Sequence, residues 1–197
     1  MVSELREHAV ASTREAAPTE ADAWAALAQV LDPEVPVLSV LELGIVRGLR
    51  IDRDQVHVIV TPTYSGCPAL DAIQDSIRSA LLAEGAREVH IELQFAPAWT
   101  TDWIAPEAAE KLRRYGIAPP HAASLPAHAV APSEVGGPVS AAAPVITRPL
   151  RFQPRDVPCP RCGAASTERL SAFGSTACKA LYRCLSCREP FEYFKPL

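Results

Sequence analysis

Residues 45–84, IVRGLRIDRDQVHVIVTPTYSGCPALDAIQDSIRSALLAE, contain the alternations that decide the fold. Apolar and polar residues alternate over most of 45–51 and again over 56–60, with a polar turn between them, which predicts a β-hairpin. A loop over 61–68 then leads into apolar residues at helical spacing, which predicts a helix over about 68–84. The stretch therefore predicts two strands, a loop and a helix in that order.

The sequence on either side extends this pattern. A capped helix is expected to begin at Thr19 and to end at Asp32-Pro33, because the residue before a proline avoids the α region. Alternation over 87–95 predicts a third strand, and a short helix is expected over about 106–115. The resulting α-β-β-α-β-α order indicates a small α+β domain over residues 19–116. Since a helix separates the second and third strands, we expect these two to be parallel or non-adjacent.

The remaining segments differ in composition from this domain. Residues 117–150 hold 7 prolines and 9 alanines, which is typical of a partly extended linker. Residues 1–18 are expected to form a disordered tail, and they lack the apolar core of a secretory signal. The formal net charge of −4 produces no strong field for nucleic acid, and no segment is apolar enough to cross a membrane. We therefore expect a cytoplasmic protein without nucleic-acid or membrane partners.

Four cysteines in residues 151–197 have the spacing of a zinc ribbon. Cys159 and Cys162 form one CxxC pair, Cys184 and Cys187 form another, and 21 residues separate the two pairs. Zn²⁺ binds four thiolates in a tetrahedron, and a module of 47 residues has too little apolar core to fold without such support. The spacing predicts a structural zinc site. An iron–sulfur cluster on the same sulfurs is the main alternative.

The other two cysteines lie outside the CxxC pairs. Cys178, in Phe173–Lys179, fits either a buried small residue or an additional, exchangeable metal ligand. Cys67 directly precedes a predicted helix N-terminus, where the helix dipole favours the thiolate. Asp32 and Glu34 lie in a separate loop. A thiolate and two carboxylates would suit iron, but local sequence leaves open whether the two loops meet.

Motifs in both halves of the chain resemble known families. The first half resembles the iron–sulfur carrier domain of SufT and of cytosolic iron–sulfur targeting proteins, in DPEVP (32–36), LGIV (43–46) and TPTYSGCP (61–68). The second half resembles the PaaD (also PaaJ) family of the phenylacetyl-CoA epoxidase system, in CPRCG (159–163), FGSTACK (173–179) and FEYFK (191–195). The resemblance covers about residues 20–116 and 155–197, and both halves occur in the order found in PaaD.

The resemblance implies an accessory protein of a multicomponent di-iron monooxygenase that epoxidises the ring of phenylacetyl-CoA. PaaD-like proteins are thought to mature an iron or iron–sulfur centre there, and the oxygenase and reductase components would be the partners. The family's acidic motif falls on Asp32 and Glu34, and its loop cysteine falls on Cys67. These three residues are expected to hold iron or a cluster transiently, while zinc occupies the four tail cysteines.

Other functions remain as alternatives at this point. No catalytic residue is predicted, because a di-iron site needs several glutamates and a Glu-x-x-His motif on long helices, and the chain has neither. His57 is expected on the solvent face of its strand, and the five histidines form no cluster in the sequence. An electron-transfer or structural subunit of the oxygenase, using the tail cysteines, is the alternative function. A homodimer in which two Cys67 thiolates bridge one cluster is a further hypothesis.

Overall fold

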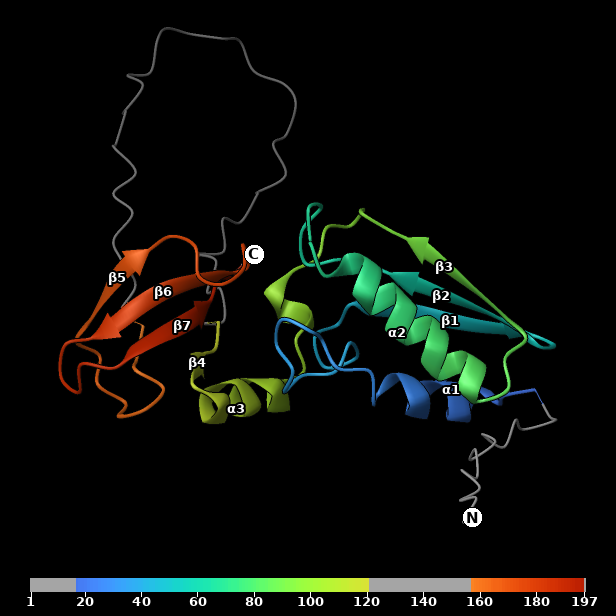
Figure 1. The fold of residues 1–197 in the computed structure, drawn as a ribbon, viewed down its shortest axis with the longest axis horizontal. Coiled ribbons are helices and arrows are strands. Elements are labelled where there is room, and N and C mark those ends of the chain that lie inside the picture. Colours follow the sequence, from blue (N-terminus) through green and yellow to red (C-terminus); the bar gives the residue numbers. More distant parts are fainter. Residues whose placement is uncertain (1–16, 121–156, 197) are drawn as a thin grey trace, which may run out of the picture.

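The computed structural model describes residues 17–120 and 157–196 (Figure 1). The first stretch contains a three-stranded sheet, its helices and a single turn of 3-10 helix. Its elements are α1 (Glu20–Leu27), β1 (Val46–Asp52), β2 (Gln55–Val60), α2 (Leu70–Ala83), β3 (Glu88–Leu93), η1 (Thr101–Trp103) and α3 (Pro106–Tyr115). The predicted α+β class and the α-β-β-α-β-α order are confirmed.

The three strands lie in the order β1-β2-β3, with α1 and α2 against one face (Figure 1). β1 and β2 form the predicted antiparallel hairpin, and β3 pairs with β2 in parallel, which the intervening helix allows. Val56, Val58 and Val60 alternate along β2 and are each 0 % exposed. This alternation places the apolar face of the sheet under the helices.

Parallel pairing of β2 with β3 also brings two histidines together. His57 is the register partner of His90, and the two rings are stacked with centroids 4.8 Å apart. The sequence suggested isolated histidines because the register between distant strands cannot be read locally. The pair lacks a third ligand that would make a metal group within the described residues.

Helix α1 ends earlier than predicted. It was expected to continue to Asp32, but it ends at Leu27, and the chain then folds back on itself. The Asp32 N–H donates to Leu38 O at 2.9 Å and the Val40 N–H donates to Val30 O at 2.9 Å, which closes a compact loop. These backbone bonds compete with continued helix, and they fix the loop that carries Asp32.

Gly44 is required where this region packs against the segment before α3. Its φ of +67° is a left-handed conformation, and an added Cβ would lie 2.5 Å from the Trp103 carbonyl oxygen. The close approach places the segment just before β1 against Trp103 of η1. Nearby, Trp99 Nε1 donates a 2.9 Å hydrogen bond to Leu43 O and ties the same two segments together.

The second described stretch forms a sheet with an additional strand from the first. Its strands are β5 (Thr167–Ser171), β6 (Lys179–Cys184) and β7 (Pro190–Phe194), and β4 (Ile117–Ala118) pairs in parallel with β7. The sheet order is β4-β7-β6-β5. Residues 117 and 118 were expected to begin the linker, but their backbone groups extend the ribbon sheet. Residues 121–150 of the expected linker and residues 1–16 of the expected 1–18 tail lie outside the described residues.

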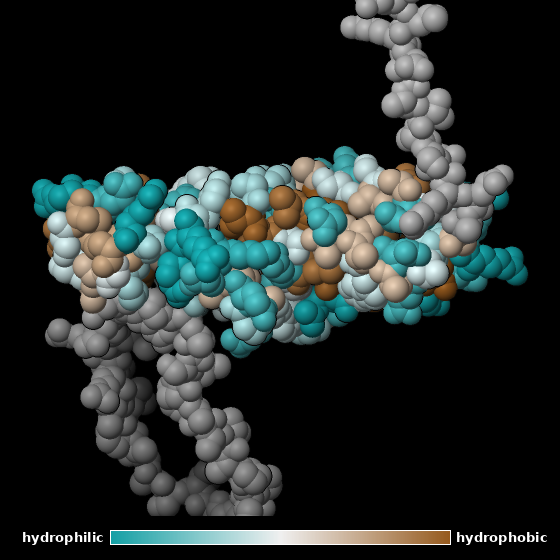
Figure 2. Space-filling model, turned by 90° about the horizontal axis from the view of Figure 1, so that it is seen from below, coloured by the Kyte–Doolittle hydropathy of each residue, from teal (hydrophilic) through white to brown (hydrophobic). Residues whose placement is uncertain are grey.

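The ribbon therefore docks on the first domain. Phe194 is 1 % exposed and belongs to the same apolar core as Leu43 and Ile45, and its ring centroid lies 6.1 Å from that of Trp99. The Phe194 side chain thus fills the seam between the two sheets. Figure 2 shows the two parts as one continuous elongated surface, with apolar residues gathered near the middle of the face in view.

Among the described helices, none has both the length and the apolar character of a membrane span.

Candidate metal centres

The four tail cysteines meet at one end of the ribbon. The ligand atoms of Cys159, Cys162, Cys184 and Cys187 all lie within 4.8 Å of one another. The Sγ atoms of Cys159 and Cys187 are 3.8 Å apart, and those of Cys162 and Cys184 are 3.6 Å apart. Four sulfurs at about 2.3 Å from one Zn²⁺ would be about 3.8 Å from each other, so the geometry fits a tetrahedral metal.

Backbone groups shape each of the two knuckles. In the first, the Gly163 N–H donates to Cys159 O at 2.9 Å, and Gly163 has a φ of +73°. In the second, the Cys187 N–H donates to Cys184 Sγ at 3.4 Å. This N–H donor lowers the pKa of the Cys184 thiol to about 6, which favours the thiolate that a metal requires.

Cys178 does not belong to this four-cysteine group. The sequence allowed it as an additional ligand in the tail, but its side chain is 4 % exposed within the core of the first domain. The four-cysteine group consists of the two CxxC pairs alone within the described residues. The loop that carries Cys178 joins β5 and β6 at the end of the sheet away from the knuckles. At the knuckle end, Thr167 of β5 pairs with Cys184 of β6.

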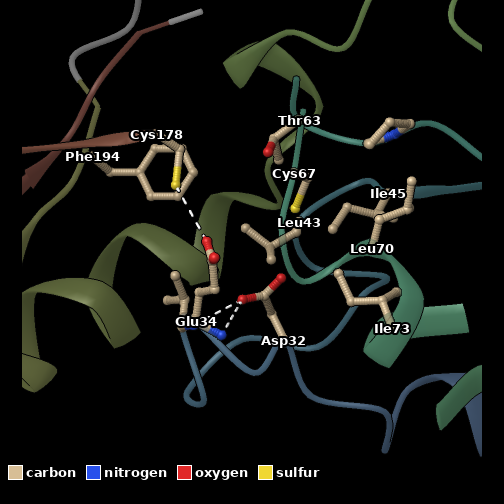
Figure 3. Close-up of a pocket in the computed structure, with 12 residues that line it drawn as sticks. Asp32, Glu34, Leu43, Ile45, Thr63, Cys67, Leu70, Ile73, Cys178 and Phe194 are labelled. Carbon is tan, nitrogen blue, oxygen red and sulfur yellow. Dashed lines mark hydrogen bonds between the residues drawn. The ribbon is translucent and has the colours of Figure 1, made fainter. Parts of the chain in front are cut away.

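A second candidate centre lies where the two domains meet. The loop with Asp32 and Glu34, the loop with Cys67 and the ribbon residue Cys178 line one small cavity (Figure 3). The remaining walls are largely apolar and include Leu43, Ile45, Ile73 and Phe194. The structure thus places Asp32, Glu34 and Cys67, which the sequence placed in two unrelated loops, around one cavity. Among the described residues, only the four tail cysteines already have their ligand atoms at the mutual spacing of a metal site.

Asp32 is held in this cavity by main-chain donors. Its Oδ1 accepts hydrogen bonds of 2.8 Å from the N–H groups of Glu34 and of Val35, and the residue is 6 % exposed. Burial raises the pKa of Asp32 above its ordinary 3.8, although the two N–H donors oppose the shift. The carboxylate is therefore fixed in position while its charge lacks full compensation.

Glu34 is less enclosed than Asp32, because its side chain is only partly buried. Burial and the neighbouring Asp32 both raise the pKa of Glu34, whereas the Lys179 ammonium lowers it. Glu34 Oε2 lies 4.0 Å from Cys178 Sγ, and Figure 3 shows the two side chains pointing toward each other. The carboxylate of Glu34 therefore faces the ribbon, whereas that of Asp32 is held by its own loop.

Cys67 faces the same cavity from the opposite loop. The sequence suggested that the helix N-terminus would favour its thiolate, but α2 begins at Leu70, and burial raises the pKa of the Cys67 thiol to about 11. The Ala69 N–H opposes this shift, and Glu34, Asp32 and Cys178 reinforce it. Cys67 is therefore a neutral thiol at pH 7, and a bound cation would favour loss of its proton.

The cavity is small enough to limit what it can hold. Its open volume is about 10 Å³, close to the space needed by one water molecule. An acyl-CoA or an aromatic ring cannot enter such a space. Thiols and carboxylates around an ion-sized volume are suited to a single metal cation, and an iron–sulfur cluster would fit only after the loops that line the cavity move apart.

Lys179 was missed by sequence reasoning as part of this centre. Its side chain is 3 % exposed, and its Nζ contacts Glu192 Oε2 at 2.9 Å and Glu34 O at 3.2 Å. A lysine at the start of a largely apolar strand was the available signal, because lysine is seldom fully buried without a partner.

Comparisons with known proteins agree with this two-part organisation. Residues 20–93 match the family described as iron–sulfur cluster assembly protein, and residues 144–195 match the PaaD zinc beta ribbon domain. The chain is 45 % identical over 180 residues to a putative 1,2-phenylacetyl-CoA epoxidase subunit of Escherichia coli (strain K12). That alignment covers 91 % of this chain and 94 % of the relative.

The chain belongs to the PaaD family.

Two further relatives match a smaller share of this PaaD-family chain. The "Fe-S protein maturation auxiliary factor" of Porphyromonas gingivalis (strain ATCC BAA-308 / W83) is 37 % identical over 92 residues, which covers 46 % of this chain and 87 % of the relative. The "Fe-S protein maturation auxiliary factor YitW" of Bacillus subtilis (strain 168) is 36 % identical over 80 residues, which covers 39 % and 76 % respectively. The PaaD-family chain therefore combines an iron–sulfur assembly-type domain with a zinc ribbon domain.

Proposed function

We propose that this PaaD-family protein is an accessory maturation factor that receives iron, as an ion or as an iron–sulfur cluster, and delivers it to a phenylacetyl-CoA epoxidase. Cys67, Asp32 and Glu34 would hold the cargo. The observation that carries the proposal is the meeting of these three side chains in one cavity, although they lie in separate loops. The assembly-type domain and the maturation-factor relatives support the same role.

The chemistry of the site suits transient holding. Iron binds thiolate and carboxylate ligands, and Lys179 is the cation that offsets the charge of the Asp32 and Glu34 carboxylates. Iron binding would release the proton of Cys67. Iron would leave again wherever a partner offers a stronger ligand set, because Cys67 can then take a proton back. The iron would have few protein ligands and would lie at the seam between the two domains, so a partner could take it.

The tail cysteines have a different role in this proposal. Zinc at Cys159, Cys162, Cys184 and Cys187 would stabilise the ribbon, whose own core is small. The oxygenase and reductase components would be the partners, and the six free cysteines fit work in the reducing cytoplasm. The protein would not itself catalyse oxygenation.

The test compares wild type, Cys67→Ser, the tail variant Cys159→Ser and a control in the same loop as Cys67, Ser65→Ala, whose side chain is exposed. Each protein is loaded anaerobically with ferrous iron, with and without sulfide, and its iron and zinc contents are measured. Each variant also replaces the wild-type protein in cells, where epoxidase activity is assayed. We expect Cys67→Ser to lose the iron and the epoxidase activity while it keeps one zinc.

Two outcomes would count against the proposal. Full epoxidase activity in Cys67→Ser cells would remove Cys67 from any maturation role. Iron that stays in Cys67→Ser but disappears in Cys159→Ser would place the iron at the tail and would favour an electron-transfer subunit.

A further inference from the structure

We infer that Cys178, a ribbon residue, supplies a second thiolate to the iron held at Cys67, so that the ribbon completes the iron site. This inference rests on the proposed function, because it adds a ligand to the same cargo. It gives the ribbon a part in metal handling beyond its own zinc.

The position of Cys178 is the first support. It lines the cavity together with Cys67, Asp32 and Glu34, and its Sγ lies 4.0 Å from Glu34 Oε2. In Figure 3 the Cys178 sulfur points toward the Glu34 carboxylate, and Cys67 lies across the cavity on the facing loop. A cysteine that only fills space in a core is not expected to point its thiol at a carboxylate.

Cys178 is also unused elsewhere. The four zinc-ribbon cysteines already form a complete tetrahedral set, so the ribbon metal has no need of a fifth sulfur. Cys178 lies in the core of the first domain, whereas Cys159 and Cys184 lie in the core of the ribbon. The two sets of sulfurs thus belong to different centres.

The loop that carries Cys178 is built to hold it in place. The Ser175 N–H donates to Glu192 Oε1 at 2.6 Å, and the Gly174 N–H donates to Lys179 O at 2.8 Å. Thr176 Oγ1 lies 3.0 Å from Cys178 Sγ and orients the thiol. Such a set of contacts around one side chain is typical of a ligand kept in position by its neighbours.

Lys179 anchors this loop to the acidic one. Its buried ammonium contacts Glu192 of the ribbon and the main-chain oxygen of Glu34. Lys179, the neighbour of Cys178 in sequence, thus contacts Glu34 directly, and this contact keeps Cys178 close to Glu34. The distance between the two thiols of the site depends on docking of the ribbon.

The binding step involves no change of oxidation state. An Fe–S bond forms as the S–H bond of Cys178 breaks, and the proton passes to Glu34 Oε2 and then to solvent. Cys67 loses its proton in the same way. Two thiolates, with the carboxylates of Asp32 and Glu34, would then hold the iron until a partner takes it.

The experiment measures how many sulfurs surround the iron in the full-length protein. Wild type, Cys178→Ala, Cys178→Ser, Cys67→Ser and the exposed ribbon control Ser166→Ala are loaded with ferrous iron under anaerobic conditions. X-ray absorption at the iron edge counts sulfur neighbours of iron alone, so zinc-bound sulfurs do not interfere. A second arm adds sulfide and compares cluster yield by absorption, which separates ion cargo from cluster cargo. Zinc content and thermal unfolding report on folding, and alanine at the buried position avoids a new polar group.

We expect two protein sulfurs per iron in wild type and in Ser166→Ala, and one in both Cys178 variants. Iron affinity should fall about tenfold or more in those variants. If Cys178→Ala keeps the sulfur count and the affinity while Cys67→Ser loses the iron, the inference is wrong and the proposed function stands. If wild type takes up no iron beyond the tail in either arm, or Cys67→Ser keeps it, both fail.

Discussion

The Nζ of Lys179 donates a 3.2 Å hydrogen bond to the main-chain oxygen of Glu34, across 145 residues of sequence. This contact joins the ribbon to the acidic loop of the first domain. The contribution of this contact to the free energy of unfolding determines how firmly the ribbon is held at the candidate iron site.

Replacement of Lys179 by methionine should destabilise the seam. The change leaves Glu192 without its 2.9 Å partner and Glu34 O without a donor, so we expect a loss of about 2–4 kcal/mol in the free energy of unfolding. Chemical denaturation measures this loss. The matched control is Lys111→Met, which breaks a 2.6 Å pair with Glu42 on the surface and should cost less than about 1 kcal/mol. Equal losses of unfolding free energy in the two variants would show that the buried pair stabilises the fold no more than the surface pair does.

Gly174→Ala should displace the loop that carries Cys178. An added Cβ would lie 2.6 Å from Glu192 Oε1 and 3.2 Å from the Lys179 Cβ, so Glu192 must move from its bond to Ser175. We expect a cost of about 1–3 kcal/mol and a lower affinity for ferrous iron, with zinc content unchanged. Gly48→Ala is the control, because the nearest atom to its added Cβ would be 3.6 Å away on the Ile59 side chain. An unchanged iron affinity in Gly174→Ala would separate the loop from the site.

Asp32→Asn should stabilise the metal-free protein at neutral pH while it weakens iron binding. Asparagine can still accept the two 2.8 Å bonds from Glu34 N–H and Val35 N–H, but it carries no buried charge. Because burial raises the pKa of Asp32 in the folded protein, ionisation costs stability as pH rises through that raised pKa. No such cost exists below the ordinary value of 3.8.

The stability gain of Asp32→Asn over wild type should therefore be on the order of 1 kcal/mol at pH 7 and should vanish toward about pH 3. Thermal or denaturant unfolding across this pH range measures the difference. A gain that grows as pH falls would contradict the buried-charge explanation. Retention of iron affinity at pH 7 would remove Asp32 from the ligand set.

Zinc removal should unfold the ribbon and expose the seam. Its apolar cluster is small, and the tetrahedral sulfurs connect its two knuckles. We expect chelation, or Cys184→Ser, to change the near-UV circular dichroism of Tyr182 and Tyr193 and to open Phe194 to solvent. If the spectrum and the iron affinity survive complete zinc loss, the ribbon folds on packing alone.

Local patterns in the sequence were sufficient to predict the helices and strands that depend only on neighbouring residues. The alternation over 56–60 predicted β2 because each side chain of a strand reports its own face. The helix over 106–115 was predicted correctly, since Pro106 begins it and Gly116, with a φ of +99°, ends it. The end of α1 was wrong by several residues, because backbone bonds from Asp32 and Val40 compete with the helix.

By itself, the sequence determined the α+β element order, the zinc-ribbon spacing of Cys159 to Cys187 and the family resemblance. These features depend on short-range periodicity and on turns of a few residues. Only the tertiary structure decided that Cys178 leaves the ribbon centre and meets Glu34, 144 residues away. The physical reason is that this meeting depends on burial of Phe194, pairing of β4 with β7 and the buried charge of Lys179, all of which arise when the two domains pack together.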